Sequence, residues 1–250
     1  MLIVLLTALG VGGATFFGAA LGFAFKNISS KFSDAVLALA AGVMLAASIN
    51  GLILPSLEFG GKFAVIITVT GILLGALLIY YVDRLVPKIR ERIRPKEKAY
   101  EENTRINKIM LFVLAIAIHN FPEGIAAGVG FGTGNVSDAL TVAFGIALQN
   151  IPEGMVIISP MLSVGIGKKK TLIYASLTGI VEIVGTFLGY FAVSMFERIL
   201  PFALAFAGGT MLYVISDEMI PETHETANPA ASTFALLIGF CIMIIANEYL

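Results

Sequence analysis

Long apolar stretches separated by short polar ones run along the whole chain. A helix needs about 20 predominantly apolar residues to cross the hydrocarbon core of a bilayer. Eight stretches meet or approach this length, at residues 1–25, 32–57, 63–86, 109–130, 139–162, 171–196, 200–216 and 230–250. The pattern therefore predicts an all-α membrane protein, a bundle of eight transmembrane helices in a single domain over residues 1–250. The first stretch has no charged leader, so we interpret it as a span rather than a secretory signal.

The composition agrees with a membrane location. The 250 residues are 58% hydrophobic and 13% charged, whereas soluble domains carry about 25% charged residues. The net charge of −1 provides no basic field for nucleic acid. The single cysteine, Cys241, excludes an intramolecular disulfide framework and a thiolate metal cluster.

The distribution of positive charge orients the bundle. If the N-terminus lies outside, the inner loops hold fourteen of the sixteen basic residues, and only Lys62 and Arg198 remain outside. The positive-inside rule favours this orientation. We therefore expect a multi-pass protein of the cell (inner) membrane with both termini outside and a charged cytosolic loop at residues 87–108. The fourth inner loop, residues 217–225, is the exception, because it holds four acids and no Lys or Arg.

One motif recurs in the middle of two neighbouring spans. The fourth span contains His-Asn-Phe-Pro-Glu-Gly at residues 119–124, and the fifth contains Gln-Asn-Ile-Pro-Glu-Gly at residues 149–154. His119 and Glu123 are four residues apart on a helix and therefore share a face. The short loop at residues 131–138 makes the two spans antiparallel neighbours, so we expect both motifs to meet near the midplane of the bilayer.

Three acids and two prolines lie deep in the spans. Besides Glu123 and Glu153, the sixth span carries Glu182 far from either of its ends, and ionisable groups inside a membrane are costly and usually functional. Pro122 and Pro152 each remove a backbone hydrogen bond, so kinked spans four and five would offer free carbonyl oxygens at the centre. Imidazole with carboxylate suits zinc, iron, manganese, cobalt and cadmium. The motifs thus predict a divalent-metal site at which metal competes with protons.

The paired motifs resemble spans four and five of the ZIP (Zrt/Irt-like) family of divalent-metal transporters. Residues 54–58 and 176–182 resemble the family's second and sixth spans, and the likeness extends over the whole chain. The resemblance implies alternating access and two adjacent metal positions. The first would be made by His119, Glu123 and Glu153. Glu123 and Glu153 would also bind the second ion and so bridge the two positions. The second position would add Asn120, Gln149, Asn150 and Glu182. Some relatives carry Asp in place of Asn150, which leaves the occupancy of the second position open.

The resulting functional prediction is uptake of a divalent transition metal into the cytoplasm by a transporter that is not an enzyme. Zinc is the first candidate, with iron, manganese and cadmium as alternatives, each bound as substrate and not as a prosthetic group. Two other classes stay open. An intramembrane metal-dependent hydrolase could use three protein ligands, although the chain has no HExxH motif. A proton-coupled carrier or channel for another solute could use the carboxylates as a relay.

Polar residues near the span ends supply further candidates. A candidate exit-side metal cluster at the cytosolic end of span seven consists of Asp217, Glu218, Glu222, His224 and Glu225. Ser56 and Glu58 are candidates at the outer entrance, and we expect Asp138 to cap span five. Close helix packing is predicted at Gly18/Gly22, Gly71/Gly75, Gly124/Gly128 and Gly185/Gly189. The expected partners are divalent metal ions and lipid, and the pattern is compatible with a homodimer.

Overall fold

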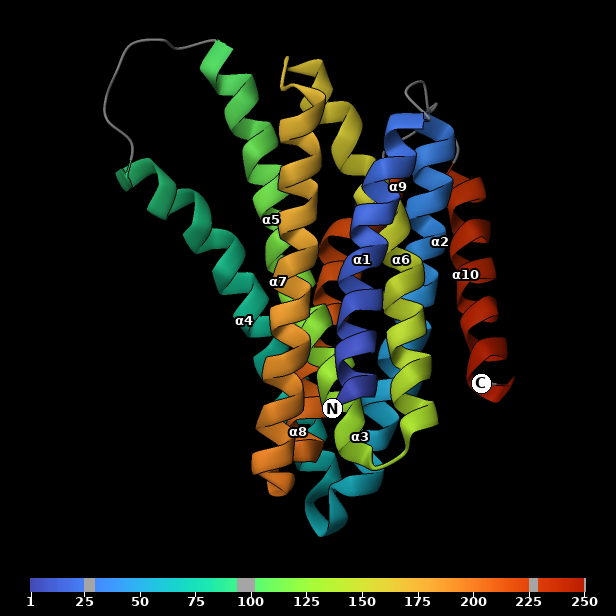
Figure 1. Cartoon of the computed structure of the whole chain (residues 1–250). Helices are drawn as coiled ribbons and strands as arrows, with labels where there is room; N and C mark the ends of the chain where they lie inside the picture. The colour runs from blue at the N-terminus through green and yellow to red at the C-terminus, as the bar shows by residue number, and fades with distance from the viewer. Residues whose placement is uncertain (25–29, 94–101, 225–228, 250) are drawn as a thin grey trace.

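The chain folds into a bundle of long helices, shown in Figure 1. The structure is a computed structural model and describes residues 1–24, 30–93, 102–224 and 229–249. No strand occurs among these residues, so the all-α prediction is confirmed. The long helices are α1 (Leu2–Ala24), α2 (Ser30–Ser48), α4 (Ala64–Ile93), α5 (Glu102–Gly130), α6 (Val136–Ser163), α7 (Lys168–Met195), α8 (Leu200–Val214) and α10 (Pro229–Tyr249).

The helices account for the eight predicted spans. Seven described helical segments are long and apolar enough to cross a membrane, and α5, which contains the predicted fourth span, packs among them. Both termini lie toward the same, lower end of the bundle in Figure 1, as an even number of crossings requires. Large apolar side chains on the outside of α4 and α10, among them Leu73, Leu77, Phe234 and Ile245, are exposed and suited to lipid.

Two spans are built from three helical segments each. A π-type segment, η1 (Ile49–Ile53), and a short helix, α3 (Leu54–Phe59), continue α2. In the same way η5 (Ile215–Met219) and α9 (Ile220–His224) continue α8. The predicted end of span seven at Ser216 is therefore wrong, and residues 217–224 are helical rather than a loop.

The wide turns explain how these two spans pass a proline. The amide of Leu54 bonds the carbonyl of Ile49, and the amide of Ile220 bonds that of Ile215, each five residues back. In both cases the next residue is the proline, at positions 55 and 221. A proline lacks the amide hydrogen that a regular turn would use, and the wider turn lets the helix continue beyond it.

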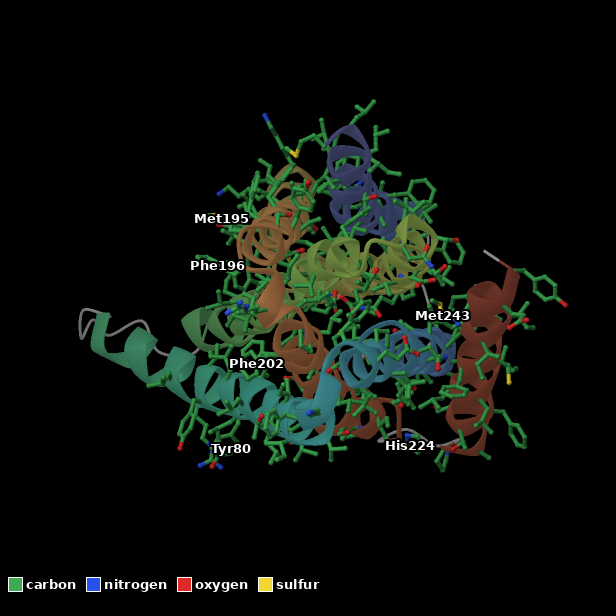
Figure 2. All side chains as sticks on the ribbon, turned by 90° about the horizontal axis from the view of Figure 1, so that it is seen from below. Tyr80, Met195, Phe196, Phe202, His224 and Met243 are labelled. Carbon is green, nitrogen blue, oxygen red and sulfur yellow. The ribbon has the colours of Figure 1, made fainter. Side chains whose placement is uncertain are left out.

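The long helices pack as two groups. The α5 group contains α1, α5, α6 and α7, and its closest pairs are α5 with α7 and α1 with α6. The α8 group contains α2 with α3, α4, α8 with α9, and α10, and its closest pairs are α4 with α8 and α2 with α10. Figure 2, seen from below, places α1, α6 and α7 on one side of the molecule and α2, α4 and α10 on the other.

The predicted glycine pairs form helix-packing seams inside these groups. A Cβ atom added at Gly124 or Gly128 of α5 would strike the backbone of α7, and one added at Gly185 or Gly189 would strike the backbone of α5. The pair Gly18/Gly22 meets α6, and the pair Gly71/Gly75 meets α8. Without a Cβ the two backbones can approach closely, which is how such pairs stabilise membrane helices. The packing prediction is confirmed at all four pairs.

Two smaller expectations are changed by the structure. The predicted loop at residues 87–108 is shorter, since α4 runs to Ile93 and α5 begins at Glu102; the remaining residues 94–101 lie outside the described part. Asp138 is not the cap of α6. Asn135 takes that place, and its side chain accepts a hydrogen bond from the amide of Ser137.

Candidate metal centre

The first copy of the motif lies in the middle of α5 and is almost completely buried. His119 is 6% exposed, Asn120 0% and Glu123 1%. Pro122 lies inside the helix, one residue before Glu123. Gly124 lies against the backbone carbonyl of Glu182 on α7. The glycine therefore brings α7, with its own acid, close to the polar face of α5.

The second copy lies in α6, and its glycine packs against a different neighbouring helix. Gln149 and Asn150 are fully buried, and Glu153 is half-buried. Gly154 lies against the backbone carbonyl of Thr15 on α1. The two copies thus fix two different helices around the centre, α7 through the first copy and α1 through the second.

Hydrogen bonds connect the two copies and the third acid. The amide of Gln149 donates to Glu123 Oε1 at 2.7 Å. The amide of Asn150 lies 2.6 Å from Glu182 Oε1 and 2.7 Å from Glu182 Oε2. The same nitrogen lies 3.1 Å from the carbonyl oxygen of Val11, and Thr15 Oγ1 lies 3.5 Å from Glu182 Oε2. Residues of α5, α6, α7 and α1 therefore form one buried polar layer.

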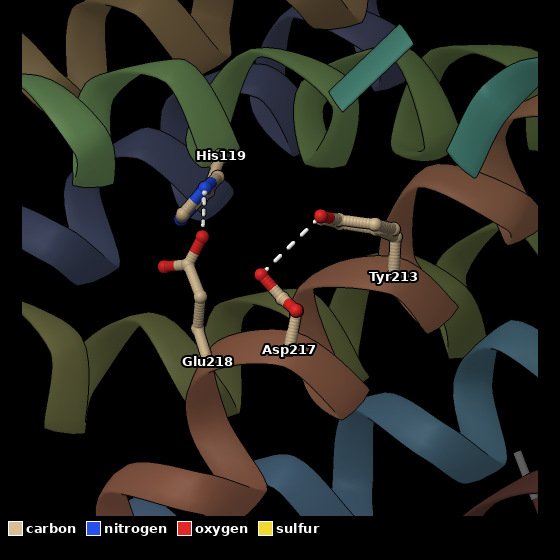
Figure 3. A network of polar contacts seen from close by, with 4 residues as sticks. All are labelled: His119, Tyr213, Asp217 and Glu218. Carbon is tan, nitrogen blue, oxygen red and sulfur yellow. Dashed lines mark hydrogen bonds and ion pairs between the residues drawn. The ribbon is translucent and has the colours of Figure 1, made fainter. Parts of the chain in front are cut away.

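The imidazole contacts the other helix group. His119 Nε2 lies 3.0 Å from Oε1 of Glu218, which belongs to η5 (Figure 3). Glu153 interacts electrostatically with both members of this pair, and Glu123 interacts with Glu153 and Glu182. The centre therefore extends from Glu182 on α7, through the acids of α5 and α6, to Glu218 in the span of α8.

Several polar atoms of the centre have no hydrogen-bond partner in the described part of the chain. These buried atoms are both side-chain polar atoms of Asn120, Oε2 of Glu123, Oε1 of Gln149 and Oδ1 of Asn150. A buried polar group without a partner is costly. Oxygen atoms of this kind are ligands for a hard or borderline cation, so the donor set fits a metal ion as a transported substrate.

The ligands are not gathered into a closed metal cage. Within the described residues, no three His, Cys, Asp or Glu side chains lie close enough together to hold one ion. His119 is instead engaged with Glu218. An ion ligated by Nε2 of His119 would therefore have to replace the contact of that nitrogen with Glu218.

The predicted exit-side residues are spread along η5 and α9. Asp217 is exposed and accepts a hydrogen bond from Tyr213 at 3.3 Å (Figure 3). Glu222 is exposed as well. The two ring nitrogens of His224 contact the carbonyl of Ile220 at 2.8 Å and the hydroxyl of Thr233 at 3.2 Å. Glu225 lies outside the described residues. Glu218, by contrast, reaches the central motifs through its contact with His119.

The predicted entrance residues have different surroundings. Glu58 is exposed. Ser56 is fully buried, and its hydroxyl donates to the carbonyl of Pro201 at 2.7 Å and lies 2.8 Å from the hydroxyl of Thr68. The serine therefore joins α3 to α8 and α4.

Two contributors from α1 were absent from the sequence prediction. These are the hydroxyl of Thr15 and the carbonyl of Val11, both of which contact the Asn150–Glu182 pair. Thr15 could have been found, because it lies among small residues, Gly12, Gly18 and Ala19, on one face of the first span. The contribution of a backbone carbonyl has no signal in the sequence.

Comparison with known proteins identifies the family. A family model described as "ZIP Zinc transporter" matches residues 96–247. The chain is 35% identical to the zinc transporter GufA of Myxococcus xanthus, with 97% of both chains covered. It is 35% identical to the zinc transporter ZIPB of Bordetella bronchiseptica, over 95% of this chain and 78% of that one. It is also 30% identical to the human zinc transporter ZIP11, over 93% of this chain and 92% of that one.

These matches span nearly the whole chain and confirm the resemblance that the paired motifs carry. They also confirm that the protein is a multi-pass membrane protein and not an enzyme, since the family consists of transporters. The chain belongs to the ZIP family of metal transporters.

Proposed function

We propose that this protein imports a divalent transition metal, with zinc as the first candidate, into the cytoplasm. The ion binds at His119, Glu123 and Glu153, where an imidazole and two carboxylates balance its charge. The relatives described above are named zinc transporters, which supports this choice. The positive-inside rule supports both termini outside, so η5 and α9 lie toward the cytoplasm.

One observation carries the proposal: the contact between His119 and Glu218. His119 belongs to the α5 group, and Glu218 belongs to the α8 group, at a distance of 3.0 Å. A carboxylate at this place can take over the ion when His119 releases it, and the imidazole can then turn to Glu218. The exposed acids Asp217 and Glu222 continue the route toward the cytosolic end.

The division into two helix groups supports alternating access. The α5 group carries the ligands, and glycine seams hold each group together internally. Movement of the α5 group against the α8 group would open the centre to one side and then to the other.

The experiment is zinc uptake into proteoliposomes loaded with a zinc-sensitive dye. Loss of a residue that merely supports a metal site costs about 10–100-fold, so loss of a ligand in His119→Ala or Glu153→Ala is expected to lower uptake by at least about tenfold. Ser194→Ala is the control, because that hydroxyl is exposed and bonds its own helix at Tyr190. If both ligand variants transport zinc like the control, the central site is not the transport site.

A further inference from the structure

Glu182 is surrounded by donors from its own helix group. Asn150 Nδ2 lies 2.6 Å from one carboxylate oxygen and 2.7 Å from the other, and the hydroxyl of Thr15 lies 3.5 Å from the second. Neither oxygen of Glu182 is among the buried atoms that lack a partner. Glu123 differs, because one of its oxygens accepts from Gln149 while the other has no hydrogen-bond partner among the described residues.

The chemistry of the surroundings fixes the direction of the Asn150 amide. The end of the side chain that faces Glu182 is surrounded by three acceptors, namely both carboxylate oxygens and the carbonyl of Val11. An amide oxygen at this place would face only acceptors, whereas the NH₂ group has two hydrogens to donate. The nitrogen must therefore point at Glu182, and the amide oxygen must point away from it.

The amide nitrogen occupies the place of a cation. A zinc ion bound by a carboxylate would lie about 2.0–2.2 Å from its oxygens, and Nδ2 lies 2.6 and 2.7 Å from the two oxygens of Glu182. An ion and this nitrogen cannot both fit between the same two oxygens. Aspartate at position 150 would place a second carboxylate against Glu182, and two facing carboxylates need either a shared proton or a cation between them.

The same contact ties three helices together. Asn150 lies on α6, Glu182 on α7, and Val11 and Thr15 on α1. Glycine contacts surround it, because Gly12 and Gly179 lie against each other's backbone and Gly154 lies against the carbonyl of Thr15. A hydrogen bond to a buried carboxylate is stronger than one between neutral groups, and this one joins helices whose backbones already touch.

We propose that Asn150 is a positioning residue whose amide replaces the second metal ion: it holds Glu182 as part of the α1–α6–α7 packing, so the centre carries one transported ion at a time. This proposal rests on the function proposed above. Glu182 is then a structural carboxylate in this chain, and Glu123, with its uncovered oxygen, is the acid of α5 that meets the ion.

The first test counts metal ions in the purified full-length protein. Cadmium or zinc is titrated by calorimetry and by equilibrium dialysis, and the ions that belong to the centre are those lost in Glu123→Ala/Glu153→Ala, because these two acids would bridge both positions. The wild type is expected to bind one such ion. Asn150→Asp is expected to bind two, and Glu182→Gln added to Asn150→Asp returns the number to one. A wild type that binds two ions, one of which is lost in Glu182→Gln, overturns the proposal.

The second test works without metal and examines the contact directly. Thermal unfolding is measured for Asn150→Ala, Glu182→Ala and the double variant in metal-free detergent solution. If the two side chains bond each other, the melting temperature of the double variant is expected to be no lower than that of the less stable single variant. Strict additivity of the two losses overturns the proposal. Thr15→Val is expected to show a smaller loss, and Thr178→Val is the control, because that buried hydroxyl bonds only its own helix at Ala175 in the described structure.

The two tests also separate this proposal from the function on which it rests. If the wild type binds no ion that depends on Glu123 and Glu153, the proposed function fails, and the double-variant cycle still decides whether Asn150 holds Glu182. If zinc is bound and transported but the count in the wild type is two, transport stands and the single-ion proposal fails.

Discussion

The two helix groups are assembled in the same way but bury different types of polar side chain. In each group glycines bring helix backbones together, at Gly124 and Gly128 in the α5 group and at Gly75 and Gly209 in the α8 group. Among the described residues, every buried imidazole, amide and carboxylate side chain lies in the α5 group. In the described part of the α8 group the fully buried polar side chains all carry hydroxyls, those of Ser48, Ser56, Thr68, Thr210, Thr223 and Ser232, and one carboxylate oxygen of the half-buried Asp34 on α2 is shielded from solvent as well.

This difference has a physical reason. A hydroxyl can satisfy itself on a carbonyl of its own helix, as Ser48 does on Met44 and Thr210 does on Ala207. Imidazoles, amides and carboxylates need partners on other helices or an ion. Their collection in one group means that most of the binding site can move as one piece.

The boundary between the groups is packed differently from their interiors. A Cβ added at Gly145 of α6 would meet the side chains of Met243 on α10 and Ala47 on α2, and one added at Gly51 would meet the side chain of Val142. None of these boundary contacts involves a neighbouring backbone. Side chains can repack when one surface slides over another, whereas interlocked backbones resist it.

If the α5 group must move against the α8 group, a cross-link between the two groups should abolish transport. A Cβ added at Gly145 lies 3.3 Å from the Cβ of Ala47, close to the span of a disulfide at about 3.5–4.5 Å. In a Cys241→Ala background, oxidised Ala47→Cys/Gly145→Cys is expected to lose zinc uptake and to regain it on reduction.

The matched control is a cross-link inside one group. Gly130→Cys/Ala139→Cys joins α5 to α6 within the α5 group, where a Cβ added at Gly130 would lie 3.6 Å from the Cβ of Ala139. Oxidation of this pair is expected to leave uptake unchanged. Equal transport by the oxidised boundary pair would show that the two groups need not move against each other.

The next effect concerns the contact between Glu218 of the α8 group and the imidazole of His119. Glu218→Gln weakens the pairing with His119 and removes a charge that can receive the ion. The Glu218 side chain is 35% exposed, so we expect a loss of about fivefold in uptake rate, equivalent to about 1 kcal/mol. The number of ions bound at the centre should not fall. Asp217→Asn is the control, since the hydrogen bond of Asp217 is to Tyr213. An equal loss in both variants would mean that uptake depends on the negative charge of this segment and not on the contact with His119.

A third prediction concerns the close backbone packing at the glycine pairs. Gly128→Ala places a methyl group against the backbone of Thr186 and Tyr190 on α7. Overpacking of this kind costs about 1–3 kcal/mol, so the melting temperature in detergent should fall. Gly13→Ala is the matched control, because a Cβ at Gly13 would meet nothing within 4 Å. If both substitutions have the same effect, close backbone approach is not what stabilises the α5 group.

The sequence predicted the parts of the centre that follow from local patterns. The copies at His119–Gly124 and Gln149–Gly154 share helix faces by spacing alone, and the four glycine pairs follow from a repeat of four residues. The pairing of Thr15 with Glu182 joins residues 167 positions apart, and no local pattern encodes it. The predicted span seven is too short, because the acids at residues 217–225 favour a loop by composition while a π-type turn carries the helix past Pro221.

The smallest expected effect concerns Ser56, which the sequence predicts at the outer entrance and which lies in a buried contact between helices. Its buried hydroxyl links α3 to Pro201 of α8 and to Thr68 of α4, so Ser56→Ala should lower stability by about 1 kcal/mol. The apparent affinity for zinc in uptake should stay the same. Glu58 is exposed, and Glu58→Gln should change the uptake rate less than about twofold, with the difference lost at high salt. A weaker zinc affinity in Ser56→Ala at unchanged melting temperature would instead support the entrance role, and would mean that the α8 group also contributes a residue that meets the ion.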